Sequence, residues 1–222
     1  MADEELIYEQ RQTTLRPGGL EEYVKQALER VWPALDDQGA KVLCLVNGLI
    51  GYPPEELIQI TRFPDWATWM RCQSQGNLPG NELAEEETIR LLKPVASRPK
   101  PYIPPEDRRA VYGYRRFFIQ PADLAELVHC SEEGIWPRIE AQGACILGLW
   151  TTLVVTDPLE VVLLTGYHGP AHWEETRVTG PKPESVDSEL WDRDAQLRAR
   201  RVQITMKSWV CLMRAIEVAP FG

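Results

Sequence analysis

Two histidines four residues apart are the side chains of this 222-residue chain that most directly suggest chemistry. An imidazole titrates near neutrality, so His168 or His172 could act as a general base. An i, i+4 histidine pair close to Glu174 and Glu175 could also bind a metal or a haem iron. However, Gly169-Pro170 interrupts helical geometry, and histidines in surface loops are commoner than metal ligands. We therefore expect His168 to be catalytic and His172 to contact a ligand, without a bound metal or other cofactor.

Two arginines occupy equivalent places in apolar segments, and a buried arginine needs an acidic or carbonyl partner. Arg11 and Arg115 could bind an oxyanion of a ligand, and we assign Arg11 to ligand binding and Arg115 to catalysis. The structural alternative is that each forms a salt bridge, with Glu56 and Glu160 respectively.

Tryptophans are the third candidate group, because an indole can stack on a planar ligand. Trp66 and Trp173 lie at the start of predicted helices, and Trp150 lies in a predicted strand. Packing in the core or in an interface is the alternative role for these side chains.

The elements that position these residues are written twice in the chain, with an offset of 104 positions that aligns Tyr8 with Tyr112. Trp32-Pro33 then falls on Trp136-Pro137, and Gln38-Gly39-Ala40 falls on Gln142-Gly143-Ala144. A duplication of this length determines the architecture before any motif is considered.

Each copy follows the order βαββαβ, which is typical of the ferredoxin-like unit with an antiparallel sheet and helices on one face. The first helix of each copy carries an apolar stripe at i, i+3, i+4, i+7 spacing. Proline near its end should kink or restart the helix, and Gly39 and Gly143 should stop it. The predicted strands are 6–15, 41–50, 56–63, 88–95, 111–119, 145–155, 160–167 and 209–218. The predicted helices are 20–35, one from Trp66, 124–139, one from Ala171, and a long helix over 189–207.

The predicted fold class is α+β, with two tandem ferredoxin-like repeats forming an α-β barrel of the dimeric type within one chain. The first repeat spans 1–97, a proline-rich linker spans 98–109, and the second repeat spans 110–222. Side chains alternate between the faces of a strand, so each strand should have one face toward the helices and one toward the barrel interior. We expect Leu43, Leu45, Leu49 and their equivalents 147, 149 and 153 to meet the helices, together with Ile58, Ile60, Val162 and Leu164. Trp150, Thr152, Thr61 and Thr165 should then line a ligand cavity, although sheet-on-sheet packing could also fill the interior.

Composition excludes several functions. The net charge of −9 would repel a phosphate backbone, which argues against nucleic-acid binding. No apolar run approaches the roughly 20 residues that a membrane-spanning helix needs. The acidic start lacks a basic leader, and five scattered cysteines without a CxxC pair indicate reduced thiols, so we expect a cytoplasmic protein.

The sequence resembles the NIPSNAP family of the dimeric α-β barrel superfamily. The resemblance rests on Tyr112-Gly113-Tyr114-Arg115, on Trp136-Pro137 seven residues before Gly143, and on Leu147-Gly148-Leu149-Trp150-Thr151-Thr152. It implies the barrel fold and favours a pocket for a small molecule, but it does not select a reaction.

The predicted function is therefore binding of a small, largely hydrophobic or aromatic molecule between the two repeats. The alternative is a cofactor-independent enzyme, such as a monooxygenase, an isomerase or a polyketide-type cyclase. A homodimer would be an additional association on top of the pairing within the chain.

Overall fold

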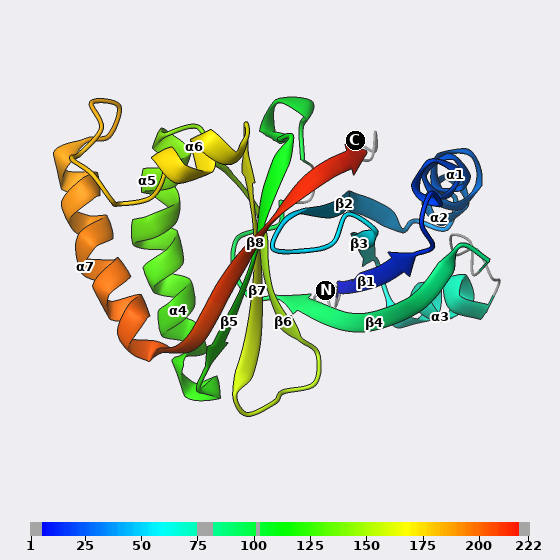
Figure 1. Ribbon diagram of the computed structural model, residues 1–222. Coiled ribbons are helices and arrows are strands. Elements are labelled where there is room, and N and C mark those ends of the chain that lie inside the picture. The colour runs from blue at the N-terminus through cyan, green and yellow to red at the C-terminus, as the bar shows by residue number, and fades with distance from the viewer. Residues whose placement is uncertain (1–5, 75–81, 101–102, 218–222) are drawn as a thin grey trace. The chain divides into compact units, whose positions relative to one another are not determined.

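The chain divides into two compact units in the computed structural model, which describes residues 6–74, 82–100 and 103–217. One unit comprises Met1–Lys93 with Met213–Gly222, and the other comprises Pro94–Leu212. Each contains a four-stranded antiparallel sheet and helices, so each has the predicted ferredoxin-like composition (Figure 1).

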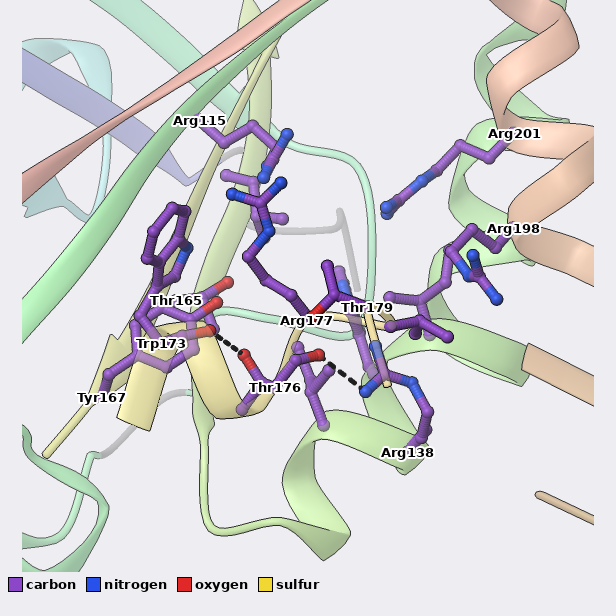
Figure 2. Close-up of a pocket in the computed structure, with 15 residues that line it drawn as sticks. Arg115, Arg138, Thr165, Tyr167, Trp173, Thr176, Arg177, Thr179, Arg198 and Arg201 are labelled. Atoms are coloured by element: carbon purple, nitrogen blue, oxygen red, sulfur yellow. Dashed lines mark hydrogen bonds between the residues drawn. The ribbon is translucent and has the colours of Figure 1, made fainter. Parts of the chain in front are cut away.

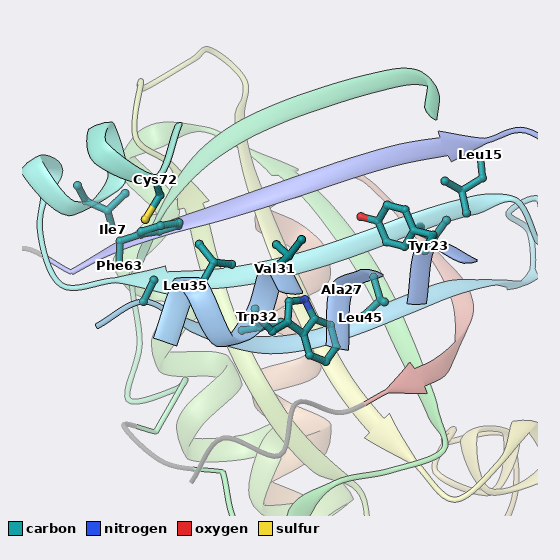
Figure 3. Packing of buried hydrophobic residues seen from close by; sticks show 13 residues of the cluster. Ile7, Leu15, Tyr23, Ala27, Val31, Trp32, Leu35, Leu45, Phe63 and Cys72 are labelled. Atoms are coloured by element: carbon teal, nitrogen blue, oxygen red, sulfur yellow. The ribbon is translucent and has the colours of Figure 1, made fainter. Parts of the chain in front are cut away.

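The first unit is built from β1 (Ile7–Leu15), β2 (Lys41–Ile50), β3 (Glu56–Phe63) and β4 (Ala84–Pro94). Its helical segments are α1 (Leu20–Gln26), η1 (Ala27–Val31), α2 (Trp32–Asp36) and α3 (Trp66–Ser74). The strand order is β4-β1-β3-β2, in which the two central strands pair Glu9 with Thr61. The helices bury one sheet face in a core that includes Ile7, Trp32 and Phe63 (Figure 3).

The second unit repeats this order as β8-β5-β7-β6. Its strands are β5 (Val111–Ile119), β6 (Cys145–Thr152), β7 (Leu159–Tyr167) and β8 (Thr205–Glu217), of which the residues from Met213 onward belong to the first unit. Its helical segments are η2 (Pro105–Asp107), η3 (Pro121–Asp123), α4 (Leu124–Cys130), η4 (Ser131–Ile135), α5 (Trp136–Ala141), α6 (Pro170–Glu175) and α7 (Ser188–Ile204). β5 pairs Gly113 with Thr165 of β7, so the register repeats the offset seen in the sequence.

The first helix of each copy is interrupted as the prolines predict. A π-helical turn, η1 or η4, precedes Trp32-Pro33 and Trp136-Pro137. Proline lacks the N–H that would continue the α-helical ladder, so a wider turn is accommodated there. Gly39 (φ 83°) and Gly143 (φ 91°) end the helices in the left-handed conformation that the sequence predicted.

The strand boundaries agree with the predictions within a few residues, but the directions of several side chains do not. Leu57 and Phe63 face the helices on β3, and Val161 and Leu163 do so on β7. The prediction that Ile58, Ile60, Val162 and Leu164 face the helices is therefore wrong. Both faces of these strands are buried, and the helix-side face also carries the polar side chains of Gln59, Thr61 and Thr165, so the alternation of residue types does not indicate which face meets the helices.

Bulges explain a second error of the same kind. The pairing register shifts between Val42 and Cys44 on β2 and between Ile146 and Gly148 on β6. Val42 and Ile146 consequently join the same helix-side cores as Leu45 and Leu149, although strict alternation would place residues three positions apart on opposite faces. A bulge adds one residue to a strand and reverses the parity on one side of it.

The long helix α7 has no counterpart in the first unit, where α3 leads to β4 without a further helix in the described residues. It packs against η4, α4 and α5 (Figure 1). Gly134 of η4 allows this approach, because a Cβ atom there would lie 2.8 Å from Leu197. The first copy has Arg30 at this position.

Three further predictions concern the linker, the end of the last strand and membrane-spanning helices. The proline-rich segment after β4 begins in an extended conformation along β6, with Val95 donating to the Leu149 carbonyl oxygen at 3.2 Å. The predicted end of the last strand at Val218 lies outside the described residues. Within the described part of the chain, no helix is both long enough and apolar enough to cross a bilayer.

Candidate functional site

A pocket of about 280 Å³ opens on the helix-covered side of the second unit. β5 and β7 form its floor, and η4, α5, α6, α7 and the segment after α6 surround it (Figure 2). We call it the arginine pocket. Its lining residues are Arg115, Ile135, Trp136, Arg138, Ile139, Leu163, Thr165, Tyr167, Trp173, Thr176, Arg177, Val178, Thr179, Arg198 and Arg201.

Five of these residues are arginines and none is acidic, in a chain whose net charge is −9. Two of the arginines are fixed by an acidic residue just behind the wall. Arg138 lies 3.1 Å from the buried carboxylate of Asp194, which also binds Arg198 at 3.1 Å. Arg138 additionally donates to the Thr176 carbonyl oxygen at 2.8 Å. Arg138 of α5 is therefore linked to α7 by the ion pair and to the end of α6 by the hydrogen bond.

Arg115 and Arg201 have no such partner. Neither forms a salt bridge or a side-chain hydrogen bond with any of the described residues. Their guanidinium groups instead lie 5.7 Å and 5.1 Å from the centre of the Phe117 ring. Both side chains are half-buried, so their charges are incompletely hydrated without compensation by a carboxylate.

The electrostatic consequence is a lowered pKa for both guanidinium groups. Burial lowers the pKa of Arg201 to about 10, and the positive charge of Arg115 contributes in the same direction. Burial also lowers the pKa of Arg115, and Arg177 adds to that shift. The guanidinium groups repel one another, and the nearby Asp194 carboxylate is already bound by Arg138 and Arg198, so the pocket favours the binding of an anion.

Arg177 completes the cationic group at the exposed side of the pocket. Its guanidinium carbon lies 4.9 Å from the centre of the Trp173 ring, and its contact with Glu174 is long and exposed, at 3.9 Å. Figure 2 shows the guanidinium groups of Arg115, Arg177 and Arg201 extending toward the same space.

Aromatic and polar groups line the rest of the pocket. Trp136 is 3% exposed, and its buried Nε1 has no hydrogen-bond partner among the described residues. In the first unit, the equivalent Trp32 Nε1 donates to Gln59 Oε1 at 3.0 Å. Leu163 occupies the position of Gln59 in the second copy, so the acceptor is missing there. Burial raises the pKa of Tyr167, whose phenol therefore stays neutral near pH 7.

Carboxylates neutralise Arg11, the counterpart of Arg115 in the first unit. Arg11 is 1% exposed and donates through Nε to Glu9 Oε1 at 2.9 Å. It also forms a short ion pair with Glu87. Glu56 instead accepts from Gln12 at 2.7 Å, and Glu160 pairs with Arg116. The predicted salt bridges of Arg11 with Glu56 and of Arg115 with Glu160 are therefore wrong. Each glutamate contacts the residue that follows the arginine in its strand, which is Gln12 or Arg116.

The predicted site residues separate into two groups. Arg115, Thr165 and Trp173 come together in the arginine pocket, although Thr165 was expected on the opposite sheet face. Thr61 and Arg11 occupy the equivalent places in the first unit, where Thr61 accepts from Gln59 Nε2 at 3.0 Å. The structure thus places these five residues on the helix-covered faces.

The other predicted residues lie elsewhere. Trp150 is fully buried beside Gly148, and Thr152 donates to the Val154 carbonyl oxygen at 2.8 Å in the following turn. Trp66 is 41% exposed and makes an edge contact with Trp69. None of these three residues lines the arginine pocket.

The ring of His172 is held by hydrogen bonds to the backbone at His168 and at Gln142. His172 Nδ1 accepts the backbone N–H of His168 at 3.1 Å, which places the ring proton on Nε2, 2.8 Å from the Gln142 carbonyl oxygen. Both ring nitrogens of His172 are used, and neither histidine lines the pocket.

Arg177, Arg201 and Trp136 are the functional candidates that the sequence interpretation missed. The alignment of the two copies contained a signal for two of them. Arg177 stands where the first copy has Gln73, and Trp136 faces Leu163 where Trp32 faces Gln59. Arg201 belongs to the helix that the first copy lacks, so the duplication could not identify it.

Comparisons with known proteins place this architecture in a fold class. Over 97% of this chain and 96% of the other, it is similar to a protein from Lactobacillus acidophilus NCFM provisionally assigned as a monooxygenase (12% identity, TM-score 0.65). It is also similar to an anthrone oxidase-like protein over 97% of this chain and 93% of the other (10% identity, TM-score 0.61). These likenesses confirm the predicted fold class, α+β with tandem ferredoxin-like units of the dimeric α-β barrel type.

The structural matches also include an uncharacterized NIPSNAP-like domain protein from Burkholderia xenovorans. It is 19% identical and covers 46% of this chain and 94% of its own, with a TM-score of 0.35. No protein-family model and no curated protein matches the sequence.

Proposed function

We propose that the protein binds a small organic anion with an apolar or aromatic body in the arginine pocket. The observation that carries this proposal is the presence of two half-buried guanidinium groups, Arg115 and Arg201, without a carboxylate partner in the described residues. A charge-assisted hydrogen bond to a ligand would offset their desolvation. The sequence interpretation placed a small hydrophobic or aromatic ligand between the repeats, whereas this pocket lies within the second unit.

The size and lining of the pocket support a ligand with a mainly apolar body. A volume of about 280 Å³ is at the lower end of ordinary small-molecule sites. Ile135, Ile139, Leu163 and Val178 supply aliphatic contacts beside two indole rings. The buried Nε1 of Trp136 requires an acceptor, which a polar atom of the ligand would supply.

Binding can be tested by calorimetry and thermal unfolding with benzoate, benzyl alcohol and benzylamine. These probes share a ring and differ in charge. We expect benzoate to bind and to raise the unfolding temperature, because a ligand that binds the native state stabilises it by mass action. Arg115→Met and Arg201→Met should each weaken benzoate binding by about tenfold or more. Equal binding of all three probes, or no binding of benzoate, would contradict the proposal.

An enzymatic role is the second candidate, and the names of the similar monooxygenase-assigned and oxidase-like structures favour it. Guanidinium groups in a partly desolvated cavity could stabilise an enolate or a phenolate during a cofactor-independent reaction. Oxygen uptake measured with anthrone distinguishes this role from binding alone. Uptake that depends on Arg115 would support a monooxygenase, whereas uptake no faster than in buffer would support the binding function.

A further inference from the structure

In the first unit, the place equivalent to the arginine pocket is occupied by the side chain of Glu9. An inference drawn from this comparison rests on the proposed function. Glu9 of the first unit aligns with Gly113 of the second. The alignment is also structural, since Glu9 pairs with Thr61 and Gly113 pairs with Thr165 at the same point of each sheet. The second unit therefore lacks a carboxylate at the position where the first unit has one.

The Glu9 carboxylate is surrounded by donors in the first unit. Its Oε1 accepts from Arg11 Nε at 2.9 Å. Its Oε2 accepts from Trp69 Nε1 at 2.7 Å and from Gln73 Nε2 at 2.6 Å. Glu9 is 2% exposed, so this arrangement is a buried carboxylate site in which both oxygens are hydrogen-bonded.

The second unit retains the donors of this arrangement after losing the carboxylate. Arg115 replaces Arg11, Trp173 replaces Trp69, and Arg177 replaces Gln73 with a charged donor group. All three residues line the arginine pocket. Arg115 and Trp173 are identical to their counterparts, and the third position has gained a positive charge.

We propose that the arginine pocket binds the carboxylate of a small organic acid at the place that the Glu9 side chain occupies in the first unit. One carboxylate oxygen accepts from Arg115, and the other accepts from Trp173 Nε1 and Arg177. The apolar body of the acid extends toward Trp136 and Leu163. A planar group with two oxygens matches this donor arrangement, whereas phosphate carries additional oxygens that the Glu9 arrangement does not serve.

A second replacement indicates that the acid carries another oxygen acceptor. Gln59 supplies an acceptor to Trp32 Nε1 in the first unit, and Leu163 cannot supply one to Trp136. The second unit lacks the acceptors that Glu9 and Gln59 supply in the first unit. The donors that correspond to them, on Arg115, Trp173 and Trp136, all line the arginine pocket. A hydroxyl, ether or keto oxygen on the body of the acid would satisfy Trp136.

Gly113→Glu tests the proposal by restoring the carboxylate of the first unit. Gly113→Ala is the matched control, because a Cβ atom there would lie 3.1 Å from Tyr167 Cε2 and either variant must displace that ring slightly. Calorimetry with benzoate should show affinity within about threefold of wild type for the alanine variant. The glutamate variant should bind benzoate at least about tenfold more weakly. Equal benzoate affinity in the two variants would overturn the proposal.

Trp173→Phe keeps the proposal testable if the glutamate variant does not fold. It removes the indole N–H and preserves most of the ring, so benzoate affinity should fall about fivefold or more. Trp66→Phe, at an exposed tryptophan outside the pocket, should leave the affinity unchanged. Equal affinities of the two phenylalanine variants would contradict a carboxylate held by Trp173.

Phenylphosphonate separates failure of this inference from failure of the proposed function. If wild type binds phenylphosphonate more tightly than benzoate, the carboxylate assignment is overturned while anion binding stands. If neither probe binds, the proposed function itself fails. Tighter binding of benzoate is the expected result.

Discussion

At the residue scale, the arginines of the pocket lower the stability of the free protein and favour the binding of an anion. Arg115 and Arg201 are partly removed from water, which lowers the pKa of both, and neither forms a salt bridge with a carboxylate of the described residues. Binding sites commonly contain such unfavourable groups, because the same charges become favourable when a ligand arrives. Arg11 shows the alternative, in which the protein supplies the carboxylate itself.

Arg201→Met should therefore stabilise the free protein while weakening benzoate binding. We expect the free energy of unfolding to rise by about 1 kcal/mol, because the variant removes a poorly hydrated charge that repels Arg115. Urea unfolding without ligand measures this change. Arg200→Met on the same helix is the control, and it should lose slightly because Arg200 pairs with Glu126 on the surface. A loss of stability in Arg201→Met would contradict the account of the pocket.

Tyr23 should make stability depend on alkaline pH. Burial raises its pKa from 10.0 to about 12. Above pH 10 the unfolded state releases the phenol proton while the folded state retains it, so stability falls as pH rises toward 12. Tyr23→Phe should reduce this decline between pH 8 and pH 11, measured by urea unfolding at both values. An unchanged slope in the phenylalanine variant would show that Tyr23 does not contribute.

Sequence reasoning identified three residues of the pocket and missed others for physical reasons. Arg115 was selected because it recurs in both copies, Thr165 because of strand alternation, and Trp173 because an indole can stack on a ligand. The differences between copies were more informative, since Glu9 against Gly113 and Gln73 against Arg177 mark where internal partners were lost. The histidine pair was distinctive in sequence, but its hydrogen bonds fix a local turn.

At the element scale, the repeat and the periodicity predicted the strands and helices well. Proline and glycine determined where the first helix of each copy changes and ends, as the π-helical turns and the positive φ angles show. The faces of the strands could not be predicted in the same way. Both faces are buried, polar residues such as Gln59 and Thr165 lie on the helix side, and the bulges in β2 and β6 change the parity without a sequence signal.

The close packing of α7 on η4 leads to a prediction about Gly134. Gly134→Ala should destabilise the protein by about 1–3 kcal/mol, because the new methyl group would collide with Leu197. It should also weaken benzoate binding, since displacement of α7 moves Arg201. Thermal unfolding and calorimetry test both effects.

Gly180→Ala is the control for this experiment, because a Cβ atom there meets nothing within 4 Å. The double variant Gly134→Ala with Leu197→Ala should recover part of the loss, since the collision is relieved. An alanine at position 134 that leaves both stability and binding unchanged would show that α7 does not depend on this contact.

At the scale of the whole molecule, the two units differ in whether the equivalent arginine has a carboxylate partner within the protein. The first unit encloses a complete ionic network of Glu9, Arg11, Gln73 and Glu87. The second unit lacks the internal carboxylate, and it contains the helix α7, which carries further arginines. The duplication alone predicted two related units, but the sequence of one copy could not show in which unit a carboxylate of the protein would pair with the arginine.

Glu9→Gln should destabilise the first unit without affecting the ligand site. We expect a loss of about 2–4 kcal/mol, because the buried Arg11 loses a charged partner and the new amide N–H group faces donors. Glu86→Gln on the exposed face of β4 should change stability little. The benzoate affinity of both folded variants should equal that of wild type, and a weakened affinity in Glu9→Gln would place the ligand in the first unit.

A crystal structure with 4-bromobenzoate tests the central claim most directly, because the anomalous signal of bromine locates the ring and the density locates the carboxylate. The account predicts one molecule per chain, with its carboxylate between Arg115, Trp173 and Arg177 and its ring toward Trp136 and Leu163. A molecule bound away from the second unit, or one whose carboxylate points out of the arginine pocket, would contradict it.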